Sequence, residues 1–182
     1  MKYNYLVLAL AVSALSACQL APQGLERGEH TLISFDQLAA ADSQCQCVGV
    51  RLGGKVISAK ALSNTQSELE VLSLPVDKYS AKPIPEAHSN GRFIVRIPHF
   101  IDPLSIQEHY ITVKGKLAGE QLGKIDQAEY RFPVINAERV HRWQTYVEYY
   151  NDEDPWYGVR SPFFLQGGFL ELPVIKTRIA LQ

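Results

Sequence analysis

Residues 111–117, Ile111-Thr112-Val113-Lys114-Gly115-Lys116-Leu117, are the stretch that decides the fold class. Apolar residues or glycine occupy the odd positions, and polar residues occupy the even ones. Successive side chains of a β-strand point to opposite faces, so an alternation of period two is typical of a strand with one buried face. The segment therefore predicts a half-buried β-strand.

Four other segments repeat this alternation, and turn signals separate them. The further strands are expected at 48–53, 68–72, 92–97 and 130–134, and the turn signals are Gly53-Gly54, Ser63-Asn64, Asn90-Gly91, Asp102-Pro103 and Gly119. Several short strands with little helix predict a mainly β protein, either a small antiparallel OB-like barrel or a β-sandwich. The pair Gly53-Gly54 favours the barrel, because barrel strands bend or bulge at such positions.

Less regular segments flank the predicted strands. Ser34, with Gln37 three residues later, predicts the start of a short N-terminal helix that ends near Asp42. Residues 75–90 contain three prolines and predict a long surface connection. Residues 146–182 are rich in aromatic and acidic side chains and predict an irregular C-terminal extension. Within it, a last strand after Trp143 and docking of residues 163–181 on the barrel both remain open.

The bulk composition is that of a globular protein. Of the 182 residues, 46% are hydrophobic and 20% charged, which suits one domain with a terminal extension. The net charge of −1 provides no basic footprint, so nucleic acid is not an expected partner. Three cysteines are too few for a disulfide scaffold.

The N-terminus has the pattern of an export signal. Lys2 is followed by an almost wholly apolar run, Tyr5–Leu15. This run is too short for a membrane-spanning helix, which needs about 20 residues. A charged start, an apolar centre and a small-residue end are typical of a secretory signal.

The end of this signal, Leu15-Ser16-Ala17-Cys18, resembles the lipobox of bacterial lipoproteins. The resemblance implies cleavage before Cys18 and acylation of that residue. One acyl chain binds a membrane only marginally, whereas two or three on one residue hold a protein there stably. Gln19 at the following position implies outer-membrane sorting in a Gram-negative cell. The predicted organisation is a signal over 1–17, a lipidated tether over 18–33, a barrel domain over 34–145 and an extension over 146–182.

Six segments in order resemble the Slp (starvation lipoprotein) family. They are Val50–Ala59, Leu69–Pro83, Gly91–Arg96, Phe100–Pro103, Tyr110–Ile125 and Tyr130–Ile135, and they include the element Arg51-Leu52-Gly53-Gly54. The resemblance implies a lipid-anchored outer-membrane protein, facing the periplasm and associated with starvation or stationary phase. It also implies no established catalytic activity.

Two groups of residues are weak candidates for a metal site. Cys45 and Cys47 are two positions apart, which on a strand is too far for an unstrained disulfide. A structural zinc ion usually takes four ligands, and no second cysteine pair accompanies them. Buried thiols or a strained bridge are the favoured interpretations. His99 and His109 flank the Phe100–Pro103 segment and form the other candidate, against surface histidines near turns. We expect no metal and no cofactor.

No catalytic motif is found, so an enzyme is not expected. The sequence lacks a G-x-S-x-G nucleophile motif and a phosphate-binding loop. A cluster of five aromatic residues near the C-terminus suits a membrane interface or a partner surface. They are Tyr146, Tyr149, Tyr150, Trp156 and Tyr157. The alternative is that Tyr146, together with Trp143, covers one end of the barrel.

Together these observations predict a structural or interaction module of the Gram-negative envelope. It would be held by Cys18 and would bind an envelope protein or glycan. The alternative is a periplasmic carrier of a small molecule, glycan or metal, using the barrel mouth and the 75–90 connection. Such a carrier requires a pocket with converging polar groups.

Overall fold

A computed structural model describes residues 21–28, 31–40, 48–151 and 175–182. The chain divides into two compact units, Met1–Trp143 and Gln144–Gln182, and each is described by itself.

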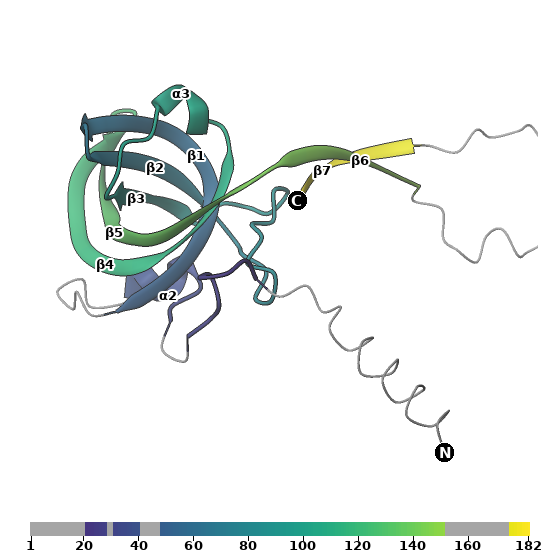
Figure 1. The fold of residues 1–182 in the computed structure, drawn as a ribbon, viewed down its shortest axis with the longest axis horizontal. Coiled ribbons are helices and arrows are strands. Elements are labelled where there is room, and N and C mark those ends of the chain that lie inside the picture. Colours follow the sequence, from purple (N-terminus) through teal and green to yellow (C-terminus); the bar gives the residue numbers. More distant parts are fainter. Residues whose placement is uncertain (1–20, 29–30, 41–47, 152–174) are drawn as a thin grey trace, which may run out of the picture. The chain divides into compact units, whose positions relative to one another are not determined.

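The first unit is a closed five-stranded barrel. Its strands are β1 (Gly49–Ser63), β2 (Gln66–Leu74), β3 (Gly91–Ile97), β4 (Tyr110–Ile125) and β5 (Ala128–Trp143). They follow one another around the ring in the order β1-β2-β3-β5-β4 (Figure 1). Neighbours are antiparallel except for β3 and β5, which are parallel. The mainly β class and the OB-like barrel are therefore confirmed.

Strand β4 shows why the alternating pattern produces this barrel. Ile111, Val113 and Leu117 are buried and join the hydrophobic core, while Lys114 and Lys116 keep some exposure to solvent. The inward side chains of β1, β2, β3 and β5 complete the same core. The interior of the barrel is thus packed with side chains, as in other small barrels.

Two short helices contribute to this core from opposite sides of the barrel (Figure 1). Helix α2 spans Phe35–Ala40, and the Gln37 backbone N–H donates to Ser34 Oγ at 3.2 Å. Its expected end near Asp42 lies outside the described residues. Helix α3 spans Pro103–Ile106, and Asp102 caps it by accepting from the Leu104 N–H at 3.0 Å. The turn expected at Asp102-Pro103 is thus a helix start.

The glycine pair in β1 serves close strand packing. A Cβ atom at Gly54 would overlap the backbone carbonyl of Leu72 on β2. The nearest irregularity in the β1–β2 register lies further on, between Val56 and Ser58. The registers of β1 with β2 and with β4 are both regular at Gly53-Gly54, so no bulge lies there. The glycines instead allow the close approach of the neighbouring strand.

The second unit contains a two-stranded antiparallel sheet of β6 (Thr145–Asn151) and β7 (Ile175–Leu181). Gln144 and Gln182 extend it by exchanging backbone hydrogen bonds of 3.0 and 2.9 Å. The sequence left open a last strand after Trp143, but it did not predict pairing with the C-terminus. Within the described parts of the chain, no helix is both long and apolar enough to cross a membrane.

Candidate functional site

The outer face of β2 and β3 carries a ladder of opposite charges. Leu69 and Val71 point into the core, so the alternating Glu68 and Glu70 point outward. Arg92 and Arg96 do the same on β3, and Arg96 lies directly opposite Glu68. Arg92 Nη1 lies 2.9 Å from Glu70 Oε1, and Arg96 Nε lies 3.4 Å from Glu68 Oε2. These pairs are half-buried, so solvent screens them only in part.

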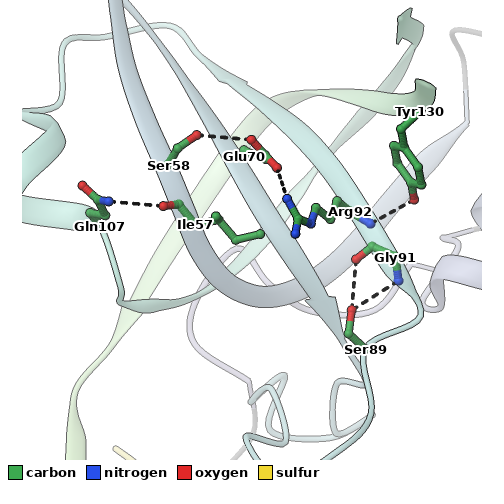
Figure 2. Close-up of polar contacts among 8 residues, drawn as sticks. All are labelled: Ile57, Ser58, Glu70, Ser89, Gly91, Arg92, Gln107 and Tyr130. Atoms are coloured by element: carbon green, nitrogen blue, oxygen red, sulfur yellow. Dashed lines mark hydrogen bonds and ion pairs between the residues drawn. The ribbon is translucent and has the colours of Figure 1, made fainter. Parts of the chain in front are cut away.

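Neighbouring strands hold this ladder in place, and Figure 2 shows the part of it around Glu70 and Arg92. Ser58 Oγ on β1 donates to Glu70 Oε2 at 3.3 Å. The backbone N–H of Arg92 donates to the Tyr130 hydroxyl of β5 at 3.1 Å. Arg96 Nη2 donates to Gln121 Oε1 of β4 at 2.8 Å. Side chains of three neighbouring strands, β1, β4 and β5, therefore fix the positions of these polar groups.

The outer half of the β4–β5 hairpin folds onto β3. Gly119, with φ +100°, marks a shift in the β4–β5 register between Leu117 and Glu120. Beyond it, Phe132 and Val134 pack with the outward-facing Ile94 in a second hydrophobic cluster. The outer surface of β3 is thus covered by apolar contacts at its centre and by polar side chains around them.

A small cavity of about 140 Å³ lies between this hairpin and the charge ladder. Pockets for drug-sized ligands measure about 300–1,000 Å³, so this one suits a single small unit. Its formal charges balance, because two lysines and two glutamates line it. The lining residues are Ser58, Lys60, Glu68, Glu70, Ile94, Gln121, Gly123, Lys124 and Phe132. The arrangement suits a neutral, hydroxyl-rich group that touches one apolar edge.

Of the candidate site residues named from the sequence, those that the structure describes lie elsewhere. Cys18, Cys45 and Cys47 fall outside the described residues. His99 is exposed just after β3, and His109 Nδ1 lies 3.1 Å from the Gln107 carbonyl oxygen of its own loop. Neither histidine lines the cavity. Among the described residues, no group of three or more His, Cys, Asp or Glu side chains could hold a metal.

Part of this face was readable in the sequence. The alternation in 68–72 and 92–97 already places two glutamates and two arginines outward, although it did not show that these two strands are neighbours. Gln121 and Phe132 gave no such signal, because their role depends on the hairpin folding back onto β3. The cavity also lies on the outside of the barrel and away from residues 75–90, where the carrier hypothesis expected a pocket.

A second polar feature lies on the outer surface of β1. Arg51 is only 1% exposed, and its guanidinium donates to the Leu25 carbonyl at 3.1 Å and the Lys78 carbonyl at 3.0 Å. Burial lowers the pKa of Arg51, as does nearby Arg27, while Asp77 acts in the opposite direction. The side chain thus ties an N-terminal segment and the 75–90 connection to the barrel.

This contact changes the picture of the predicted tether. Leu25 is fully buried, and Leu32 forms a parallel bridge with Val50 of β1. Backbone bonds of 2.9 and 2.8 Å join Leu32 to Gly49 and Arg51. Much of what the sequence predicted as a tether is therefore docked on the barrel.

Comparison with known proteins gives consistent matches. The model of the family described as "Outer membrane lipoprotein Slp family" matches residues 15–169. An "Uncharacterized protein" of Haemophilus influenzae is 43% identical over 142 residues, which cover 78% of this chain and 77% of the relative. "Outer membrane protein Slp" of Escherichia coli is 34% identical over 140 residues, covering 76% and 73%. "Uncharacterized lipoprotein YeaY" of the same organism is 30% identical over 155 residues, covering 81% and 78%.

Among solved structures, a small single-stranded DNA-binding protein from Streptomyces coelicolor resembles this chain with a TM-score of 0.30 and 16% identity. The match covers 52% of this chain and 93% of the other.

Proposed function

Because the chain belongs to the outer membrane lipoprotein Slp family, and so to lipid-anchored outer-membrane proteins, we propose that acyl chains on Cys18 anchor it. We further propose that its barrel faces the periplasm and acts as a non-catalytic interaction module that binds envelope glycan. The observation that carries the glycan proposal is the polar cavity on the outer face of β2 and β3.

The anchor proposal rests on the sequence around Cys18. The family match begins at Leu15, the first residue of the lipobox-like Leu15-Ser16-Ala17-Cys18. Two or three acyl chains on one residue provide the two membrane signals that stable anchoring requires. The association with starvation or stationary phase stays a prediction from the family resemblance.

The glycan proposal rests on the chemistry of the cavity. Carboxylates accept hydrogen bonds from sugar hydroxyls, and the amide of Gln121 can both donate and accept. Balanced charges disfavour a strongly anionic or cationic ligand. By analogy, OB-folds often bind oligosaccharides on the face of strands 2 and 3. The volume fits one sugar ring of a longer chain, which would run across the open face.

Metabolic labelling with a radioactive fatty acid tests the anchor. We expect label in the wild-type protein and none in Cys18→Ala. A variant with Cys45→Ala and Cys47→Ala controls for acylation elsewhere and should keep full labelling. Equal labelling of wild type and Cys18→Ala would exclude the anchor.

Titration of the purified lipoprotein in detergent micelles tests the ligand. Disaccharide fragments of peptidoglycan and neutral oligosaccharides of the outer-membrane glycolipid serve as probes. We expect Gln121→Ala to weaken binding about tenfold, because it removes a hydrogen-bonding group worth about 1.4 kcal/mol. Glu120→Gln on the same strand is the matched control, since Glu120 does not line the cavity. Equal affinities of wild type and Gln121→Ala would place any binding elsewhere. Capture of an envelope protein without any glycan would favour a protein partner.

A further inference from the structure

The path of the chain toward its N-terminus is fixed on one side of the barrel. Lys114 Nζ on β4 donates to the Glu26 carbonyl at 3.0 Å, and Arg51 on β1 donates to the Leu25 carbonyl. The Leu25 N–H in turn donates to the Pro22 carbonyl at 2.9 Å. Gly24 lies against the Arg139 side chain of β5. The segment 22–26 therefore runs over the outer surface of β1, β4 and β5.

The proposed anchor limits how far this side of the barrel can move from the membrane. Cys18 precedes the buried Leu25 by seven residues. A chain of seven residues spans at most about 25 Å, whatever its conformation. If acyl chains hold Cys18 in the membrane, the surface around Leu25 stays within that distance of the lipid headgroups.

This surface carries an excess of positive charge. Arg27, Lys78 and Arg139 are exposed, and Lys82 and Lys114 are half-exposed. Lys78 lies with its ammonium 4.7 Å from the ring centroid of Tyr79, whose side chain is 66% exposed. A cluster of basic groups with an exposed aromatic ring is typical of a surface that meets anionic headgroups.

The acidic groups on the same surface are engaged in local contacts. Asp77 accepts hydrogen bonds from the Ser80 N–H, the Ser80 hydroxyl and the Tyr79 N–H, which lower its pKa. Glu26 accepts from the Gly24 N–H, which lowers its pKa in the same way. The exposed Glu138 beside Arg139 lies 3.9 Å from Lys116. With these two residues included, six basic side chains face three carboxylates, and the balance of the surface is positive.

We propose that the surface formed by Arg27, Lys78, Lys82, Lys114 and Arg139, here called the anchor face, lies on the outer membrane and binds anionic lipid headgroups. This inference rests on the proposed anchor at Cys18. In the ring order β1-β2-β3-β5-β4, strand β4 lies across the barrel from β2 and β3. The charge ladder of β2 and β3 consequently faces away from the membrane.

Depth-dependent fluorescence quenching of the reconstituted lipoprotein tests this orientation. A fluorophore is placed at Tyr79→Cys on the anchor face, or at Leu122→Cys on the outer hairpin, where Leu122 is 74% exposed. Both variants also carry Cys45→Ser and Cys47→Ser. The vesicles contain phosphatidylethanolamine with phosphatidylglycerol and a headgroup-labelled quencher, or phosphatidylcholine with the same quencher. We expect strong quenching only at residue 79 and only with phosphatidylglycerol.

Charge neutralisation provides the matched comparison. Each basic side chain near an anionic surface contributes a factor of about five to the population bound. We compare the amount of protein whose anchor face lies on the membrane with the amount whose anchor face is turned away. The double variant Arg27→Gln/Lys78→Gln should lower this ratio about 25-fold. The control Lys60→Gln/Lys124→Gln removes the same charge at the cavity and should leave the quenching unchanged.

The possible failures are separable. Protein that does not float with the vesicles would overturn the anchor at Cys18. Protein that floats, but shows equal quenching at residues 79 and 122, would overturn the anchor face and leave the anchor intact. Unequal quenching that is the same in both lipid mixtures would overturn the role of anionic headgroups.

Discussion

Arg51 is one of the residues that attach the N-terminal segment to the barrel. A buried guanidinium is stable only where carbonyl or carboxylate groups replace its water shell. Leu25 and Lys78 supply two carbonyls, while Arg51 Nε has no hydrogen-bond partner among the residues that the structure describes. Arg51 therefore joins two segments to the barrel through hydrogen bonds to their carbonyls, although its guanidinium is not fully hydrogen-bonded within the described part of the chain.

Replacing this residue should release the N-terminal segment. In Arg51→Ala, two carbonyls lose a charged donor and a cavity opens, so we expect a loss of about 3 kcal/mol in unfolding free energy. Urea denaturation measures this loss, and trypsin should cut after Arg27 faster than in wild type. Arg131→Ala removes an arginine whose side chain is 76% exposed and should change neither property. Unchanged tryptic cleavage in Arg51→Ala would show that other contacts hold the segment.

At the scale of elements, the close contact between β1 and β2 depends on Gly54. Gly54→Ala would push a methyl group into the Leu72 backbone, which cannot move without disturbing the sheet. We expect a loss of about 3 kcal/mol, the upper range for overpacked sites. At Gly49 on the same strand, the nearest atom to a new Cβ would be 3.8 Å away, so Gly49→Ala should cost less than about 0.5 kcal/mol. Similar midpoints in urea for both variants would contradict this account.

The outer half of the β4–β5 hairpin depends on Phe132. Truncating a buried phenylalanine costs about 3–5 kcal/mol, and Phe132 is 5% exposed. Because the loss falls outside the main core, Phe132→Ala should mainly increase amide hydrogen exchange in the outer hairpin. Exchange at Val50 and Leu69 should change far less. Leu122→Ala on the same hairpin serves as the exposed control. A uniform increase across the barrel would mean that the hairpin unfolds only with the core.

These elements also show what the sequence could and could not predict. The centres of the strands were readable, because Ile111, Val113 and their counterparts alternate with polar residues. Residues 119–131 are mostly exposed or half-buried, so alternation gave no signal for the outer halves of β4 and β5. The parallel pairing of Ile94 with Val134 joins strands distant in sequence, and no local pattern encodes it. Pairing of β6 with β7 was missed for the same reason.

At the scale of the barrel domain, the two proposed binding surfaces lie on different parts of the barrel. The anchor face combines Lys114 of β4 and Arg139 of β5 with Arg27 of the N-terminal segment and two lysines of the 75–90 connection. The cavity is lined by residues of β1, β2, β3 and the outer hairpin. A buried core separates them and does not change shape readily. Orientation at the membrane and capture of a glycan should therefore be altered by different substitutions.

Lengthening the connection to the anchor tests whether the short tether sets the orientation. The variant has a flexible Gly/Ser stretch of about 20 residues inserted between Gln19 and Leu20, and it keeps the anchor. The effective concentration of the anchor face at the membrane surface should fall, because effective concentration falls with linker length. We expect the difference in quenching between residues 79 and 122 to shrink, with an unchanged unfolding free energy and unchanged glycan affinity. If more phosphatidylglycerol restores the difference in quenching between residues 79 and 122, the charges and the short tether act together. A difference that the insertion leaves untouched would mean that the charges of the anchor face suffice alone.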